Sequence, residues 1–230
     1  MIHTEKELQL LKEEVSQMWR LVLSQLEKSK QAFLNSDIEL AREIVSREKR
    51  VDAFELKIDS DCENYIALYS PVAVDLRLVL SLIKISNTLE RIGDFAEGIS
   101  RHVINDDCNT ADSQIIEELQ LEKMFEMLIS MLSDSFVALE SENTKVSGKI
   151  LAQDNEIDMI YRNATDILTE WIVGESSNLN SPLSGQKVRC GLKLMLLIRK
   201  LERIGDHCSN IVEEIVFYVD AKVLKHGKLK

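Results

Sequence analysis

Apolar residues recur with helical spacing along almost the whole chain. In the first segment they fall three or four residues apart, which places them on one face of an α-helix; they are Leu8, Leu11, Val15, Met18, Val22, Leu26 and Phe33. This pattern predicts a helix over residues 3–34. The same reasoning predicts five more helices, over residues 38–69, 71–104, 113–139, 146–173 and 185–221.

The breaks in the pattern divide the helices into two sets of three. Asn35-Ser36-Asp37 supplies turn and N-cap residues, and Ser70-Pro71 would place proline at the first position of the third helix. The polar run 105–112 separates the sets, so we predict one unit over residues 1–108 and a second over 109–230. The basic end, residues 222–230, is expected to fray.

One hexapeptide occurs twice. Leu-Glu-Arg-Ile-Gly-Asp fills residues 89–94 and again 201–206, at an offset close to half the chain, which indicates two copies of one structural unit. A glutamate and an aspartate four residues apart in each copy share a helix face. A glycine within a helix costs about 1 kcal/mol relative to alanine. The repeated Gly93 and Gly205 therefore indicate close helix approach, or room for a bound group.

Similar acidic pairs lie on the second helix of each set, and would face the hexapeptide pairs in an antiparallel bundle. Clustered carboxylates repel one another and need a cation or raised pKa values, and oxygen-only ligands suit magnesium, calcium, manganese or iron. The eight expected metal ligands are Glu48, Asp52, Glu90, Asp94, Asp154, Asp158, Glu202 and Asp206. An ordinary charged surface, with acids paired to arginine or lysine, stays open as the alternative, above all for the pairs outside the hexapeptides.

Composition supports an all-α fold. The chain has 45% hydrophobic residues but only 2 prolines and 8 glycines, and long helices joined by short loops favour antiparallel bundles. A net charge of −11 disfavours nucleic-acid binding, and no apolar run is long enough to cross a membrane. No apolar leader begins the chain and its four cysteines form no CxxC pair, so free thiols and a cytoplasmic location are expected.

The sequence offers little for catalysis. His207 follows Asp206, but Phe95 occupies the matching place in the first half, which favours a structural histidine. Di-iron bundle enzymes use Glu-x-x-His, and no histidine here has a glutamate three residues before it. We therefore expect no enzyme, with a ferritin-like carboxylate metalloenzyme as the alternative.

Taken together, these motifs resemble the PhoU family of phosphate-uptake regulators over nearly the whole chain. The resemblance rests on the doubled hexapeptide, the stretches 47–52 and 71–77, the pair Asp154 and Asp158, and residues 205–211. It implies two three-helix bundles related by pseudo-two-fold symmetry, with iron, zinc or magnesium ions on the acidic pairs of the inner helices. The chain departs from the pattern at Glu97-Gly98, where the second half has Ser209-Asn210.

The resemblance also implies a function. It predicts a negative regulator of phosphate uptake, forming a homodimer that links the ATPase subunit of a phosphate ABC transporter to a sensor histidine kinase. An accessory protein of a sodium-phosphate cotransporter is the alternative within the family.

Overall fold

The computed structural model describes residues 2–105, 113–173, 182–225 and 228–229, and is built almost entirely of helices. This confirms the expected all-α class. In chain order the elements are α1 (Ile2–Asn35), α2 (Ile38–Tyr69), α3 (Ala73–Ile104), α4 (Ser113–Glu118), α5 (Leu121–Glu140), the 3-10 helix η1 (Thr144–Val146), α6 (Ser147–Val173), α7 (Pro182–Asp220), β1 (Leu224–Lys225) and β2 (Lys228–Leu229).

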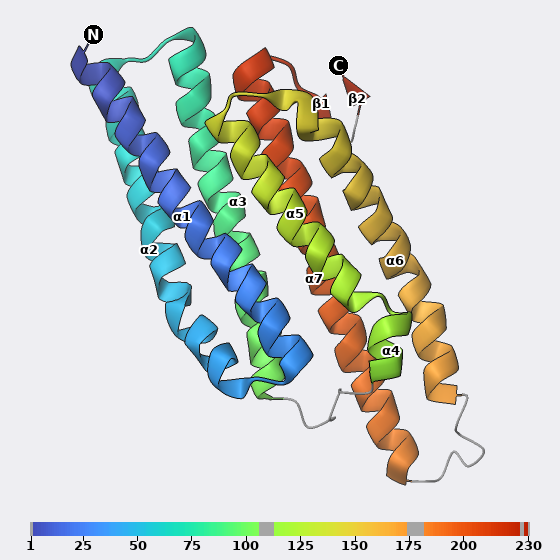
Figure 1. Ribbon diagram of the computed structural model, residues 1–230. Helices are drawn as coiled ribbons and strands as arrows, with labels where there is room; N and C mark the ends of the chain where they lie inside the picture. Colours follow the sequence, from blue (N-terminus) through green and yellow to red (C-terminus); the bar gives the residue numbers. More distant parts are fainter. Residues whose placement is uncertain (1, 106–112, 174–181, 226–227, 230) are drawn as a thin grey trace.

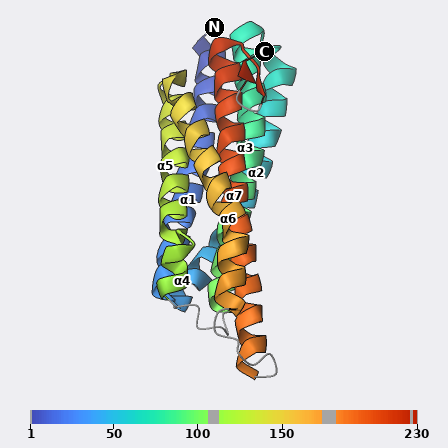
Figure 2. The same cartoon turned by 90° about the vertical axis from the view of Figure 1, so that its right-hand side faces the viewer.

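The long helices form two three-helix bundles lying side by side (Figure 1). One bundle contains α1, α2 and α3, and the other contains α5, α6 and α7. The third helices of the two bundles, α3 and α7, pack against each other in opposite directions at the centre of the molecule. Viewed after a quarter turn, the helices run nearly parallel to the long axis of an elongated body (Figure 2).

The two bundles share part of their core. Trp19 of α1 is fully buried, and its indole Nε1–H donates a hydrogen bond of 3.1 Å to the carbonyl of Leu132 in α5. The Trp19 ring also lies 5.5 Å from the ring of Phe136. A buried indole needs such a partner for its N–H, so this contact ties α1 to α5 as well as filling the space between them.

The helices differ from the prediction most clearly at two places. Ser70 ends α2 in the left-handed region with φ 45°, and α3 begins only at Ala73, so Pro71 precedes the helix instead of opening it. The expected helix over 113–139 is broken at Gln120, where φ is 52°. The break lets Leu119 and Leu121 both lie fully buried, whereas one continuous helix would turn them about 200° apart.

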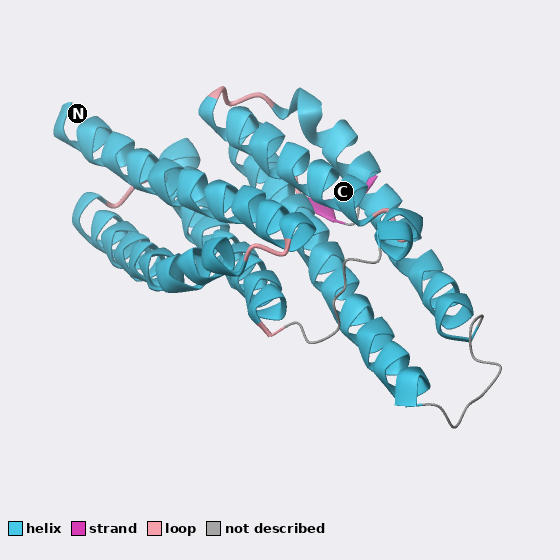
Figure 3. Cartoon of the chain, turned by 60° about the horizontal axis from the view of Figure 1, so that its bottom comes forward, coloured by secondary structure: helices cyan, strands magenta, loops and turns pink. Residues whose placement is uncertain are grey.

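Two other expectations change at the end of the chain and at the cysteines. Residues 224–225 pair with 228–229 as a short antiparallel hairpin, drawn in magenta in Figure 3, so the tail is not wholly frayed. Cys62 and Cys208 are buried free thiols, but Cys190 is disulfide-bonded, so the expectation of four free thiols was wrong. Cys108, and the unit boundary predicted beside it, lie outside the described residues.

Within the described ranges, no helix is both long and apolar enough to span a membrane.

Candidate metal centre

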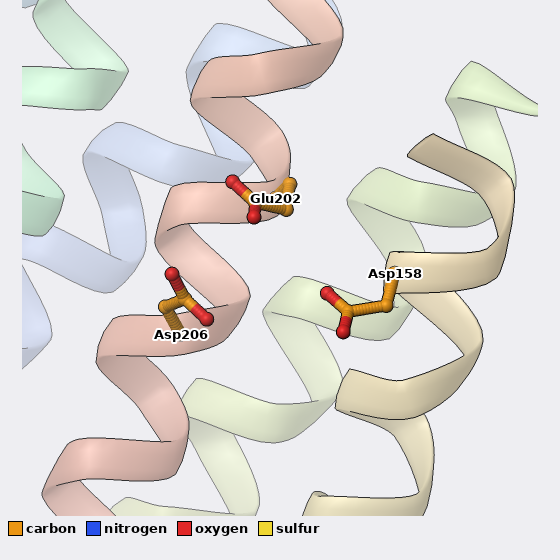
Figure 4. Close-up of side chains that lie close together, drawn as sticks. All are labelled: Asp158, Glu202 and Asp206. Carbon is orange, nitrogen blue, oxygen red and sulfur yellow. The ribbon is translucent and has the colours of Figure 1, made fainter. Parts of the chain in front are cut away.

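Three carboxylates from two helices converge in the second half (Figure 4). Asp158 projects from α6 toward Glu202 and Asp206, which lie one turn apart on α7. One oxygen from each of the three side chains lies within 4.8 Å of the others, and all three residues are partly buried. The spacing within the hexapeptide thus places Glu202 and Asp206 on one face of α7. The packing of α6 on α7 then brings Asp158 beside them.

The second-half group, defined as Asp158, Glu202 and Asp206, carries more negative than positive charge. Burial raises the pKa of Glu202, and the neighbouring carboxylates of Asp206 and Asp158 raise it further. Arg203 donates to Asp206 over 3.0 Å. Arg162, one turn along α6 from Asp158, donates to Asp158 over 3.4 Å. Both arginines lie at the exposed rim, so the centre of the group remains a site for a cation.

Asp154 lies beneath this group and does not converge with it. Its Oδ2 accepts a hydrogen bond of 2.7 Å from the Ser209 hydroxyl. Its Oδ1 is buried without a hydrogen-bond partner, and a Cβ on Gly205 would lie only 2.8 Å from it. The repeated glycine therefore leaves room for the Asp154 carboxylate of α6, which fits the close helix approach expected from the sequence. The sequence did not identify Ser209 as a residue of the site. The one signal was that the matching residue of the first half, Glu97, is different.

The first-half acids also gather, but more loosely. A hydrogen bond with the Asp52 carboxyl, burial and nearby negative charge raise the pKa of Glu48 to about 7. Burial, followed by the charges of Asp94, Glu55 and Asp52, raises the pKa of Glu90 to about 7. The four expected ligands of this half therefore share one electrostatic environment. Among the described residues, however, only the second half brings three metal-ligand atoms within 4.8 Å.

The repeats differ at the residue that faces the buried acid. In the second half Ser209 donates to Asp154. The matching first-half residue is Glu97, whose negative charge contributes to the raised pKa of Glu48. Glu97 also forms an ion pair of 2.6 Å with Arg101, one turn along α3. The first half therefore lacks the hydroxyl donor that steadies its counterpart.

His207 is buried at the position that corresponds to Phe95 in the first half. It is 7% exposed and stacks on Phe95 with ring centroids 5.7 Å apart, at the junction of α3 and α7. Burial, followed by the positive charges of Arg203 and Arg91, lowers the pKa of His207 to about 4. The imidazole is therefore neutral near pH 7, and it is not part of the second-half group.

The residues present fit a metal ion. The donors of the second-half group are all carboxylate oxygens, the set that hard cations prefer. Beneath them lies Asp154 Oδ1, a buried acceptor with no hydrogen-bond partner, which is costly in a protein interior unless a positive charge is near.

Comparison with known families decides the relationship. The model of the PhoU domain matches the chain twice, over residues 15–103 and 121–215, which together cover most of its length. The chain belongs to the PhoU family. The two matches fall on the two bundles, and they confirm the resemblance seen in the hexapeptides.

Relatives and solved structures of this family cover nearly the same length. The phosphate-specific transport system accessory protein PhoU of Edwardsiella tarda is 32% identical, over 96% of this chain and 86% of that protein. The protein of the same name from Escherichia coli K12 is 31% identical over the same shares. The crystal structure of the phosphate transport system regulatory protein PhoU from Streptococcus pneumoniae is 26% identical with a TM-score of 0.79, covering 96% of this chain and 99% of that one. PhoU from Pseudomonas aeruginosa, at 24% identity and TM-score 0.81, covers 94% of this chain and 99% of that one, and supports the fold.

Proposed function

We propose that this PhoU-family chain is an accessory protein of phosphate transport that acts as a metal-binding negative regulator. The names of its relatives, which describe accessory or regulatory proteins of phosphate transport, support the transport role. The observation that carries the metal-binding part is the convergence of Asp158, Glu202 and Asp206.

The residues of the second-half group have distinct tasks in this proposal. Glu202 and Asp206 offer two oxygens from successive turns of α7, and Asp158 adds a third from α6, so an ion held there joins the two helices. Asp154, fixed by Ser209, contributes negative charge from below. A bound cation offsets the repulsion among these carboxylates. It also places a positive charge on an otherwise acidic surface, where an oxyanion can coordinate it. Glu48, Asp52, Glu90 and Asp94 form the corresponding first-half site, and iron, zinc or magnesium is the expected ion.

Regulation by contact fits the architecture. Helices of more than thirty residues present extended faces to other proteins. The partners we propose are the ATPase subunit of a phosphate ABC transporter and a sensor histidine kinase, both met in the cytoplasm by a homodimer. A ferritin-like enzyme is less well supported, because no histidine joins the three-carboxylate group in the described part of the chain.

A complementation experiment tests the proposal. Deleting the gene should leave phosphate-starvation genes expressed in phosphate-rich medium, and the wild-type gene should restore repression. The triple variant Asp158→Asn, Glu202→Gln, Asp206→Asn should restore it only partly. The control is Asp166→Asn, Glu170→Gln, an exposed acidic pair with the same spacing on α6, which should restore it fully.

The outcomes separate the two parts of the proposal. Normal repression in the deletion strain would reject the regulatory role and favour the cotransporter alternative. Full repression by the triple variant would show that regulation does not need the second-half group.

A further inference from the structure

The N-terminal part of α7 exposes a row of aliphatic side chains, the α7 ridge, defined as Val188, Leu192 and Leu196. They are 42%, 62% and 60% exposed. Residues four apart on a helix lie about 40° from one another, so the three form one ridge along it. The opposite face of this segment packs into the second bundle, where Leu194 and Ile198 are buried. This end of α7 projects past the other helices (Figures 1 and 2), and the described part of the chain leaves the ridge exposed.

The same segment is basic in an acidic protein. Residues 182–200 contain five lysines and arginines and no acidic residue, although the chain carries a net charge of −11. Arg189 and Arg199 are exposed on the helix that carries the ridge. Lys193 adds a third positive charge at its flank and donates to the carbonyl of Asn105 over 3.2 Å. The α7 ridge is therefore an apolar surface with positively charged edges.

The ridge leads along one face of α7 into the second-half group. Arg199 and then Asp206 follow Leu192 at intervals of seven residues, which is close to two helical turns each. All three therefore lie on the same side of the helix, and Asp206 belongs to the second-half group. The distance from Leu192 to Asp206 along the helix is about 21 Å. One partner lying along α7 can thus contact both the ridge and the group.

We propose that the α7 ridge is a docking surface for a partner protein, which binds it with an amphipathic helix whose apolar face is flanked by acidic residues. This inference rests on the proposed regulation by contact and names its surface. A row of residues four apart is the feature that packs into the groove of another helix. Acidic flanks on the partner would face Arg189 and Arg199, and such complementary charge favours the right partner over others.

Two other occupants match the ridge less well. A second copy of this chain related by a two-fold axis would place ridge against ridge and bring the arginines of both copies together, which is unfavourable. A membrane-surface helix presents a wide apolar face. The α7 ridge is instead a single row, and its side of the helix continues to the carboxylates of Glu202 and Asp206. These carboxylates would face the phosphates of an anionic membrane.

Photo-crosslinking in cells tests the proposal on the full-length protein. A benzophenone amino acid replaces Leu192, and mass spectrometry identifies the segment to which it becomes linked. We expect a segment of another protein that has apolar residues three or four apart and acidic residues beside them. The control places the same amino acid at Leu68, which is exposed near the C-terminal end of α2 and should not capture that segment.

A charge reversal tests the role of the basic edge. In the Leu192 cross-linking protein, Arg189→Glu should lower the yield of the linked product about tenfold or more, because like charges then face each other. Arg42→Glu makes the same change at an exposed arginine of α2 and should leave the yield unchanged. Equal yields with and without Arg189→Glu would overturn the acidic character of the partner.

A complementation experiment separates the ridge from the metal ion. The double variant Leu192→Ser, Leu196→Ser should keep the metal content of the unaltered protein but restore repression only partly. Leu68→Ser with Val137→Ser, two exposed aliphatic positions on α2 and α5, should restore it fully. Full repression by the ridge variant would show that regulation does not use this surface.

The remaining outcomes of the cross-linking also decide the proposal. Linkage to a second copy of this chain would replace the partner protein with self-association. Lipid adducts alone, together with binding of the purified protein to vesicles of anionic but not of neutral phospholipid, would replace it with a membrane. A yield at Leu192 no higher than at Leu68 would reject the docking surface. Because cross-linking does not depend on repression, it decides the ridge even if the deletion strain represses normally and the proposed function fails.

Discussion

Replacing Gly205 by alanine tests whether the repeated glycine exists to accommodate Asp154. In an unobstructed helix position the change would stabilise the fold by up to about 1 kcal/mol. Here the new Cβ would lie 2.8 Å from Asp154 Oδ1, closer than Cβ atoms tolerate, while its contacts with Ile157 at 3.5 Å and Leu128 at 3.6 Å are ordinary. The carboxylate must therefore shift, which strains the bond that its Oδ2 accepts from Ser209. Loss of this charged hydrogen bond would cost about 1.5–3 kcal/mol.

We expect Gly205→Ala to destabilise the protein by about 1 kcal/mol, the difference between these two effects. Urea unfolding followed by circular dichroism, in chelator, measures it. Gly148→Ala is the control, because no atom lies within 4 Å of its added Cβ, and it should be neutral or stabilising. In an Asp154→Ala background, Gly205→Ala should become stabilising. The reasoning fails if Gly205→Ala stabilises the unaltered protein as much as Gly148→Ala does.

Three further predictions concern the acids and His207. The double variant Glu90→Ala, Asp94→Ala should lose the metal ion of the first half and keep that of the second half, because distant sites act independently. Elemental analysis should show about half the metal content of the unaltered protein, and an unchanged metal content would reject the assignment. The raised pKa values of Glu48 and Glu90 make the folded metal-free protein bind more protons than the unfolded chain, and together they outweigh the opposite effect of the lowered pKa of His207. Its free energy of unfolding should therefore fall overall as pH rises from about 4.5 to about 7; denaturant titrations across that range would contradict this if stability rose or stayed level. His207→Phe should keep the ring contact with Phe95 and the full metal content, and loss of metal would make His207 a ligand.

Local signals were enough to predict much of the fold. Asp37 accepts a hydrogen bond from the Leu40 amide as an N-cap, and Ser70 ends the helix, so α2 spans the predicted residues 38–69. The break between α4 and α5 was missed because it serves the burial of Leu119 and Leu121, which depends on the other helices. Tertiary packing overrides local propensity at such points.

The candidate site could be predicted in part, because local spacing again carries some of the information. Helical spacing alone places Glu202 beside Asp206, and the duplicated hexapeptide singles them out. Whether Asp154 joins them depends on Gly205 and Ser209, which contact it from another helix, so spacing could not decide it.

Anomalous diffraction from crystals grown with Mn²⁺ tests the central claim most directly, because it locates the ion relative to named side chains. The account predicts an anomalous peak among the carboxylates of Asp158, Glu202 and Asp206, within about 2.0–2.5 Å of an oxygen of each, as for hard cations with oxygen ligands. No peak at that place at saturating Mn²⁺, or peaks only on exposed acids elsewhere, would contradict it.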